Sequence, residues 1–114
     1  MLNREPIENG ILDFCRENGV GFIAYSPLAQ GLLTDRYLNG IPADSRMAKE
    51  HFLKSERRTP ELLEYLHTLQ SQAQSQGRSI AQQALAWVLD QPGVTSLLVG
   101  ASSVEQLANN LQLQ

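Results

Sequence analysis

Hydrophobic positions follow two different periods along this 114-residue chain. In residues 7–17 they recur at helical spacing, which predicts a helix that stops at Asn18-Gly19. Its apolar stripe consists of Ile7, Ile11, Phe14 and Cys15. Residues 20–25 form a short, continuous apolar run instead. This run predicts a strand that is buried on both faces and ended by Pro27.

Two more helices are predicted in the second half of the chain. Residues 59–77 begin with a Thr N-cap followed by Pro at the first helical position, and the predicted helix ends at Gly77. Residues 79–90 begin with Ser79 and Gln82 at capping-box spacing. The two stripes are Leu62, Leu66, Leu69 and Ala73, then Ala81, Ala84, Leu85 and Val88.

A second strand runs directly into a last helix. Gln91-Pro92-Gly93 breaks the preceding helix, and the apolar run at 95–99 predicts a strand. A helical pattern follows at once, with Ser102 and Glu105 at capping-box spacing. Its apolar side is Val104, Leu107, Ala108 and Leu111. The turn between strand and helix serves packing alone, or it leaves room for an anion at a helix N-terminus.

The order of the elements predicts an α/β fold that is incomplete. Strands that alternate with helices imply a parallel sheet, but two parallel strands cannot close a sheet by themselves. Residues 27–58 are about thirty residues of mostly irregular chain, and a loop of that length is usually functional or disordered. The chain therefore resembles a piece of a larger repeating β/α fold.

Composition and charge exclude several classes of protein. An apolar content of 42%, a charged content of 18% and a net charge of −3 are typical of a globular domain. They argue against nucleic-acid or membrane-surface binding, and no apolar run has the length of a membrane helix. Cys15 is the only cysteine, so no internal disulfide forms and a cytoplasmic location is expected. We expect Cys15 to pack as a small apolar residue.

Two segments in this order resemble the aldo-keto reductase family. They are IAYSPLAQGLLTDRYLNGIPADSR, residues 23–46, and AQQALAWVLDQPGVTSLLVGASSVEQLANN, residues 81–110. The likeness is to the branch with bacterial glyceraldehyde-3-phosphate reductases and potassium-channel beta subunits. That family folds as a (β/α)8 TIM barrel and transfers hydride from NADPH to aldehydes and ketones. The resemblance implies that residues 1–114 are the C-terminal portion of such a barrel, because a complete one takes about 250 residues.

The resemblance places cofactor contacts after the first strand. Tyr25 matches an aromatic residue that stacks on the nicotinamide ring, where a flat side chain fixes a flat cofactor. The pyrophosphate contacts implied by the likeness are Ser26, Pro27, Leu28, Ala29 and Gly31. From spacing alone, a Tyr that caps the strand with its hydroxyl in water is the simpler interpretation, and only the family likeness reverses it.

Two arginines of the long loop match basic positions that hold cofactor phosphates in the same branch. They are Arg36 and Arg46, and a guanidinium donates two hydrogen bonds to a phosphate at fixed geometry. Ordinary surface arginine is the alternative. Asp35 and Asp44 lie beside them in the sequence and can draw each into a local ion pair.

The turn after the second strand matches the motif that binds the adenosine 2′-phosphate. Gly100 lets the backbone approach a ligand, Ser102 adds a hydroxyl, and Gln106 projects from the first turn of the helix. Alternatively Ser102 is only the N-cap, unless Ser103 takes that role. Asn110 matches an asparagine that contacts adenine. Asn109 stands where a Glu is common, which weakens the expected bond to the adenine amino group.

The catalytic residues of the family have no match in this chain. Its reaction uses Tyr, Lys, Asp and His from the N-terminal half of the barrel, and no Tyr, Lys or His here stands at a matching strand end. We expect His51 and His67 to be surface residues. No metal-binding, P-loop or serine-nucleophile pattern is present either.

Three hypotheses about function follow. In the first hypothesis, the chain is part of an NADPH-dependent reductase of small aldehydes or ketones, glyceraldehyde 3-phosphate among them. The chain on its own lacks the catalytic residues. Alternatively it is a non-catalytic NADPH-binding regulatory module like a channel beta subunit, or an inactive truncated product. The expected partners are a small carbonyl substrate, the missing N-terminal half of the barrel and, for the parent, further copies of itself.

Overall fold

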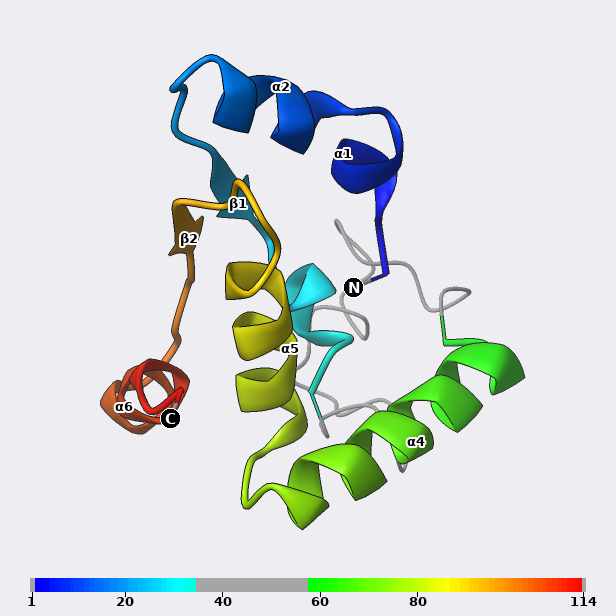
Figure 1. Ribbon diagram of the computed structural model, residues 1–114. Helices are drawn as coiled ribbons and strands as arrows, with labels where there is room; N and C mark the ends of the chain where they lie inside the picture. Colours follow the sequence, from blue (N-terminus) through cyan, green and yellow to red (C-terminus); the bar gives the residue numbers. More distant parts are fainter. Residues whose placement is uncertain (1, 35–57, 114) are drawn as a thin grey trace. The chain divides into compact units, whose positions relative to one another are not determined.

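The computed structural model describes residues 2–34 and 58–113. Its elements are α1 (Glu5–Glu8), α2 (Ile11–Glu17), β1 (Ile23–Tyr25), the 3-10 turn η1 (Ala29–Gly31), α4 (Pro60–Ser75), α5 (Ile80–Leu89), β2 (Ser96–Leu98) and α6 (Val104–Leu111) (Figure 1). The alternation of helices and strands is the one that the sequence predicts. No helix among these residues is long and apolar enough to cross a membrane.

β1 and β2 pair as a two-stranded parallel sheet, with Tyr25 opposite Leu98 (Figure 1). Each strand has three residues, so both are shorter than predicted. The pairing is extended by Phe22 and Thr95. The Phe22 amide donates to Thr95 Oγ1 at 3.0 Å, and the Thr95 amide donates to the Phe22 carbonyl at 2.8 Å.

The expectation that both faces of the strands are buried is wrong for this chain. Side chains alternate across a strand, so Ile23, Tyr25 and Leu98 share one face. These three are 57%, 80% and 62% exposed. Two strands alone provide no second layer for that face, and the described residues supply none. The sheet therefore has one open apolar face.

The helix predicted over residues 7–17 is two helices, α1 and α2. They are separated by Gly10, whose φ of +83° is left-handed and interrupts the helical period. The chain buries Leu12 and Cys15. Cys15 thus packs as predicted, whereas Ile7, Ile11 and Phe14 of the expected stripe are 38%, 45% and 62% exposed.

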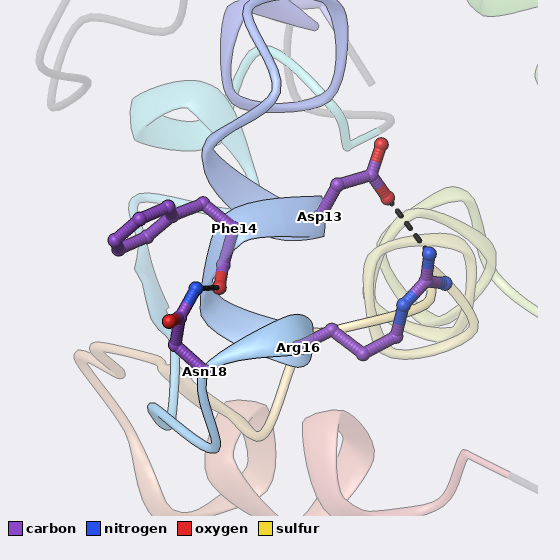
Figure 2. Close-up of polar contacts among 4 residues, drawn as sticks. All are labelled: Asp13, Phe14, Arg16 and Asn18. Carbon is purple, nitrogen blue, oxygen red and sulfur yellow. Dashed lines mark hydrogen bonds and ion pairs between the residues drawn. The ribbon is translucent and has the colours of Figure 1, made fainter.

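The end of α2 is fixed by Asn18, as the sequence predicts (Figure 2). Its side-chain Nδ2 donates to the carbonyl of Phe14 at 2.8 Å, and its backbone amide donates to the same oxygen at 3.1 Å. The Phe14 ring points away from these groups. An ion pair between Asp13 and Arg16, at 2.9 Å, lies on the exposed surface of the same helix.

The described chain divides into two compact units. One comprises Met1–Pro27 and Ala84–Gln114, and the other comprises Leu28–Gln83. In the first unit, the guanidinium carbon of Arg4 lies 5.3 Å from the centroid of the Trp87 ring, a cation–π distance. The sheet and α6 belong to this unit.

The second unit is organised by α4. Thr59 Oγ1 accepts from the Leu62 amide at 3.1 Å and caps the helix, as predicted. Leu66, Leu69 and Ala73 of the predicted stripe are buried, and the loop residue Leu32 packs against Leu62. The start of α5 has the predicted capping box, because the Gln82 amide donates to Ser79 Oγ and the Ser79 amide donates to Gln82 Oε1.

Gly93 is the glycine on which the first unit depends most. Its φ is +98°, and a Cβ there would lie 2.9 Å from the carbonyl oxygen of Leu12. Gly19 has a comparable φ of +66° but open space around it. We expect Gly93→Ala to destabilise the protein by more than about 3 kcal/mol, since the clash adds to the left-handed strain of about 1–2 kcal/mol.

Chemical denaturation of the two variants checks this prediction. Gly19→Ala is the control, in which only the left-handed strain is present, at about 1–2 kcal/mol. Equal losses of stability in the two variants would show that the backbone beside Leu12 moves to admit a methyl group.

Candidate functional site

The carboxyl ends of both strands lie at one edge of the sheet. Tyr25 and Leu98 are paired in register and the strands are parallel, so the segments that begin at Ser26 and at Val99 both leave the sheet at this edge. Ligands of parallel α/β folds bind at this edge. The structure thus places Tyr25 at this edge and Ser26 and Gly100 in the two segments that follow it. The sequence analysis assigned all three residues to a cofactor.

The ring of Tyr25 is the largest exposed aromatic surface of this edge. It is 80% exposed and lies on the open face of the sheet. A flat exposed ring beside a strand end is suited to stacking on a planar ligand.

The segment that follows the first strand has unusual backbone geometry. Ser26 has φ of +50°, and Ala29 and Gln30 have +49° and +59°. Left-handed φ is costly for residues other than glycine and concentrates at ligand sites. Within the second unit, the carbonyl of Leu28 accepts from the amides of Gly31 and Leu33, which makes Leu28–Leu33 a tight turn.

The turn between β2 and α6 divides two tasks between adjacent serines. Ser103 is the N-cap of α6, because its Oγ accepts from the Gln106 amide at 3.1 Å. The capping box predicted for Ser102 and Glu105 is therefore wrong, and the alternative that Ser103 is the N-cap is confirmed. Ser102 instead donates its amide and its hydroxyl to Gln106 Oε1, at 2.7 and 2.9 Å.

Gly100 stands in open space at the start of this turn. Its φ is not in the left-handed region, and a Cβ there would meet no atom within 4 Å. The backbone conformation and the packing of the described chain therefore do not require glycine at this position. A ligand that approaches the backbone closely would require it.

Helix α6 faces the rest of its unit with polar residues. Asn110 is only 6% exposed, and its Nδ2 has no hydrogen-bond acceptor in the structure. The expected apolar side is largely open, with Val104 86%, Leu107 44% and Leu111 74% exposed. Asn109 is exposed. A buried amide donor without an acceptor is costly, which points to an acceptor brought by a ligand or by further chain.

The remaining residues that the sequence analysis singled out include several outside the described part of the chain. Arg36 and Arg46, with Asp35 and Asp44, lie outside the described residues, as does His51. His67 is exposed on α4, as predicted. Within residues 2–34 and 58–113, no group of three or more His, Cys, Asp or Glu side chains is placed to hold a metal ion.

The profile of the aldo/keto reductase family matches residues 1–114. The chain belongs to this family. A solved thermostable aldo-keto reductase, in complex with the inhibitor epalrestat, shares its fold with a TM-score of 0.59 and 30% identity over 97% of this chain and 30% of that one. The fold is accordingly a portion of a TIM barrel, as the sequence predicts.

Two kinds of curated relatives match almost the whole chain. An L-glyceraldehyde 3-phosphate reductase of Escherichia coli O157:H7 is 51% identical over 98% of this chain and 34% of that protein. A probable voltage-gated potassium channel subunit beta of Oryza sativa subsp. japonica is 35% identical, over 98% of this chain and 35% of the relative. The chain thus spans about a third of the length of these relatives.

The cap of α6 is the position that sequence reasoning left open between two serines. Ser102 and Ser103 both precede a residue that can complete a capping box, namely Glu105 and Gln106. Spacing alone does not separate them. The extended backbone of Ser103, with φ of −148° and ψ of 158°, is the N-cap conformation that decides between them.

The two serines predict different effects on the stability of α6. We expect Ser103→Ala to lose about 0.5–2 kcal/mol of local helix stability, because the Gln106 amide loses its acceptor. Ser102→Ala removes only a hydrogen bond at the exposed surface and should cost less than about 0.5 kcal/mol.

Amide hydrogen exchange of Gln106 measures this difference. Ser103→Ala should speed the exchange roughly 2- to 30-fold, and Ser102→Ala should leave it nearly unchanged. The reverse order would return the cap to Ser102.

Proposed function

We propose that this chain supplies part of the NADPH site of an aldo-keto reductase that reduces small aldehydes or ketones to alcohols. The observation that carries the proposal is the shared edge at which Tyr25, Ser26 and Gly100 emerge from two paired parallel strands. Membership of the family supports the reductase class. The relative that is 51% identical favours a small phosphorylated aldehyde, such as glyceraldehyde 3-phosphate, as the substrate.

The groups around α6 fit the adenosine end of this cofactor. The Asn110 Nδ2 donor is buried and lacks an acceptor, which the nitrogens of an adenine ring would supply. Ser102 presents two donors at the start of a helix, where partial positive charge favours a phosphate. Gly100 leaves room for that phosphate at the backbone. We assign Gln106 and Asn109 to the same end.

We assign the nicotinamide and pyrophosphate of the cofactor to Tyr25 at the end of β1 and to the residues that follow it. In the proposal, Tyr25 stacks on the nicotinamide and fixes its orientation. The pyrophosphate is held by Ser26, Pro27, Leu28, Ala29 and Gly31, with Arg36 and Arg46 as further phosphate ligands. NADPH, when bound, supplies the hydride for reduction. The residues of this chain bind and orient it, and the group that protonates the carbonyl oxygen comes from the rest of the protein.

The open face of the sheet has a natural partner in the rest of the barrel. Parallel strands are normally covered on both faces, and Ile23, Tyr25 and Leu98 lack that cover here. The relatives are about three times as long as this chain, so they contain enough sequence for the remaining strands. We therefore propose that the N-terminal part of the barrel packs on this face. A cytoplasmic location and self-association of the parent remain predictions.

A second function is favoured by the potassium-channel relative. In this alternative the protein binds NADPH without useful turnover and reports cofactor occupancy to a partner. The 35% identity over nearly the whole chain supports it. Steady-state oxidation of NADPH by the full-length protein, with L-glyceraldehyde 3-phosphate as substrate, separates the two. Turnover supports the reductase, and tight NADPH binding without turnover supports the regulatory module. An inactive truncated product predicts instead that the isolated 114-residue chain shows neither cooperative unfolding nor NADPH binding.

Tyr25→Ala tests the nicotinamide contact in the full-length protein. We expect NADPH to bind roughly tenfold more weakly, because the ring loses its stacking surface. Calorimetric titration of NADPH measures this, with Tyr65→Ala as a control on α4. An unchanged dissociation constant for NADPH would assign Tyr25 to the packing of the barrel interior instead.

Gly100→Ala tests the approach of a phosphate to the backbone. The methyl group meets no atom within 4 Å, so the melting temperature should stay within about 2 °C of the original. The affinity for NADPH should fall roughly tenfold or more, because the methyl group occupies ligand space. A fall in stability with unchanged affinity would contradict the assignment.

A further inference from the structure

We propose that Asn18 is a site of spontaneous deamidation, through which helix α2 loses its C-terminal cap. The chain contains three Asn-Gly dipeptides, at residues 9–10, 18–19 and 39–40, and the structure describes the first two. In such a dipeptide the glycine has no side chain to shield its amide nitrogen from the preceding side-chain carbonyl. The proposal is independent of the cofactor site, because Asn18 and Gly19 lie outside it.

The reaction needs no reagent other than water. The Gly19 nitrogen attacks the side-chain carbonyl carbon of Asn18, and the new N–C bond closes a succinimide ring. The side-chain nitrogen leaves as ammonia and takes up the proton of the Gly19 amide. Water then opens the ring at either of its carbonyls. One opening gives aspartate, and the other gives isoaspartate, in which the main chain runs through the side-chain carbons.

The end of α2 leaves the attacking nitrogen available. The amides on either side of it donate to the carbonyls of Phe14 and Cys15, at 3.1 and 2.8 Å, whereas the Gly19 amide donates to no described residue. Asn18 and Gly19 are both exposed, and a Cβ at Gly19 would meet no atom within 4 Å. The link between the two residues can therefore turn toward the Asn18 side chain.

One contact opposes the reaction, and it lies at the surface (Figure 2). Asn18 Nδ2 donates to the Phe14 carbonyl at 2.8 Å, and this hydrogen bond must break before the nitrogen leaves. Hydrogen bonds at exposed helix ends open at low free energy. The cap therefore slows the attack without preventing it.

The Asn9–Gly10 dipeptide is held at more points. The Gly10 amide donates to the Ile7 carbonyl at 3.4 Å, and the Gly10 carbonyl accepts from the Phe14 amide at 2.9 Å. Asn9 Oδ1 accepts from the Ile11 amide at 3.2 Å. Gly10 is also half-buried. Attack by the Gly10 nitrogen requires the junction of α1 and α2 to open, so we expect Asn9 to keep its amide.

Deamidation changes both the hydrogen bonding and the charge at the end of α2. A carboxylate at position 18 has no proton to donate, so the Phe14 carbonyl loses its side-chain donor. The negative charge lies at the carboxyl end of a helix, where the helix dipole disfavours it. Isoaspartate also lengthens the main chain between α2 and β1. The modified protein thus has an uncapped α2 and an altered link to the strand that carries Tyr25.

Peptide mapping by mass spectrometry tests the modification in the intact protein. Folded and denatured samples are incubated in mildly alkaline buffer, and the conversion of each asparagine is followed over time. The denatured sample gives the intrinsic rate of each dipeptide, so the ratio of the two rates measures the protection by the fold. We expect the fold to slow Asn9 roughly tenfold or more and Asn18 less than about threefold. Equal protection of the two, or stronger protection of Asn18, would overturn the proposal.

The products identify the route of the reaction. A succinimide opens to both isoaspartate and aspartate, so we expect both at position 18. Direct hydrolysis of the side chain yields aspartate alone. Electron-transfer fragmentation of the peptide distinguishes the two isomers. Aspartate without isoaspartate would refute attack by the Gly19 nitrogen.

Two variants that mimic the product test the consequence for the helix. Asn18→Asp removes the cap and adds a charge at the carboxyl end of α2, so the melting temperature should fall by roughly 2–4 °C. Asn9→Asp is the matched control, because a carboxylate oxygen still accepts from the Ile11 amide and lies at the opposite end of the same helix. Its melting temperature should rise or stay within about 1 °C of the original. An unchanged melting temperature for Asn18→Asp would contradict the loss of the cap.

Discussion

The parallel pairing of β1 and β2 is the constraint on which the rest of this structure depends. It joins residues 73 positions apart, through the Phe22 amide and Thr95 Oγ1, and sets Tyr25 opposite Leu98. A parallel pair cannot be closed by a hairpin, so the intervening chain must cross over and return. Because both strands run in one direction, their carboxyl ends share an edge. The candidate site exists only because of that direction.

The same pairing leaves one face of the two-stranded sheet exposed. Ile23, Tyr25 and Leu98 alternate with the half-buried Ala24 and Leu97, so one face is covered and the other is open. An open apolar face is costly in water, and parallel sheets are normally covered on both sides. Binding of the cofactor and completion of the barrel would thus use adjoining parts of one surface, with Tyr25 at the boundary between them.

Helix caps and helix ends could be predicted from the sequence wherever residues close in the chain determine them. The Thr59 cap, the Ser79–Gln82 capping box and the stop at Asn18 were predictable because each depends on residues within four positions. The split between α1 and α2 was missed, since Gly10 adopts a left-handed φ that the apolar period does not reveal. Burial was predicted least well. Whether Phe14 or Val104 is covered depends on distant partners, and periodicity does not identify them.

The sequence of the turn from β2 into α6 is compatible with two roles at once, one in packing and one in anion binding. A glycine followed by small hydroxyl residues suits tight packing of a helix on a strand, and it equally suits an anion at a helix start. One serine cannot serve both purposes fully, because its hydroxyl oxygen would have to cap the helix while its proton is directed at the ligand. Two adjacent serines remove the conflict. Ser103 caps the helix, which leaves the amide and hydroxyl of Ser102 to donate to Gln106 Oε1. In the proposed function, stability and recognition are therefore carried by separate atoms.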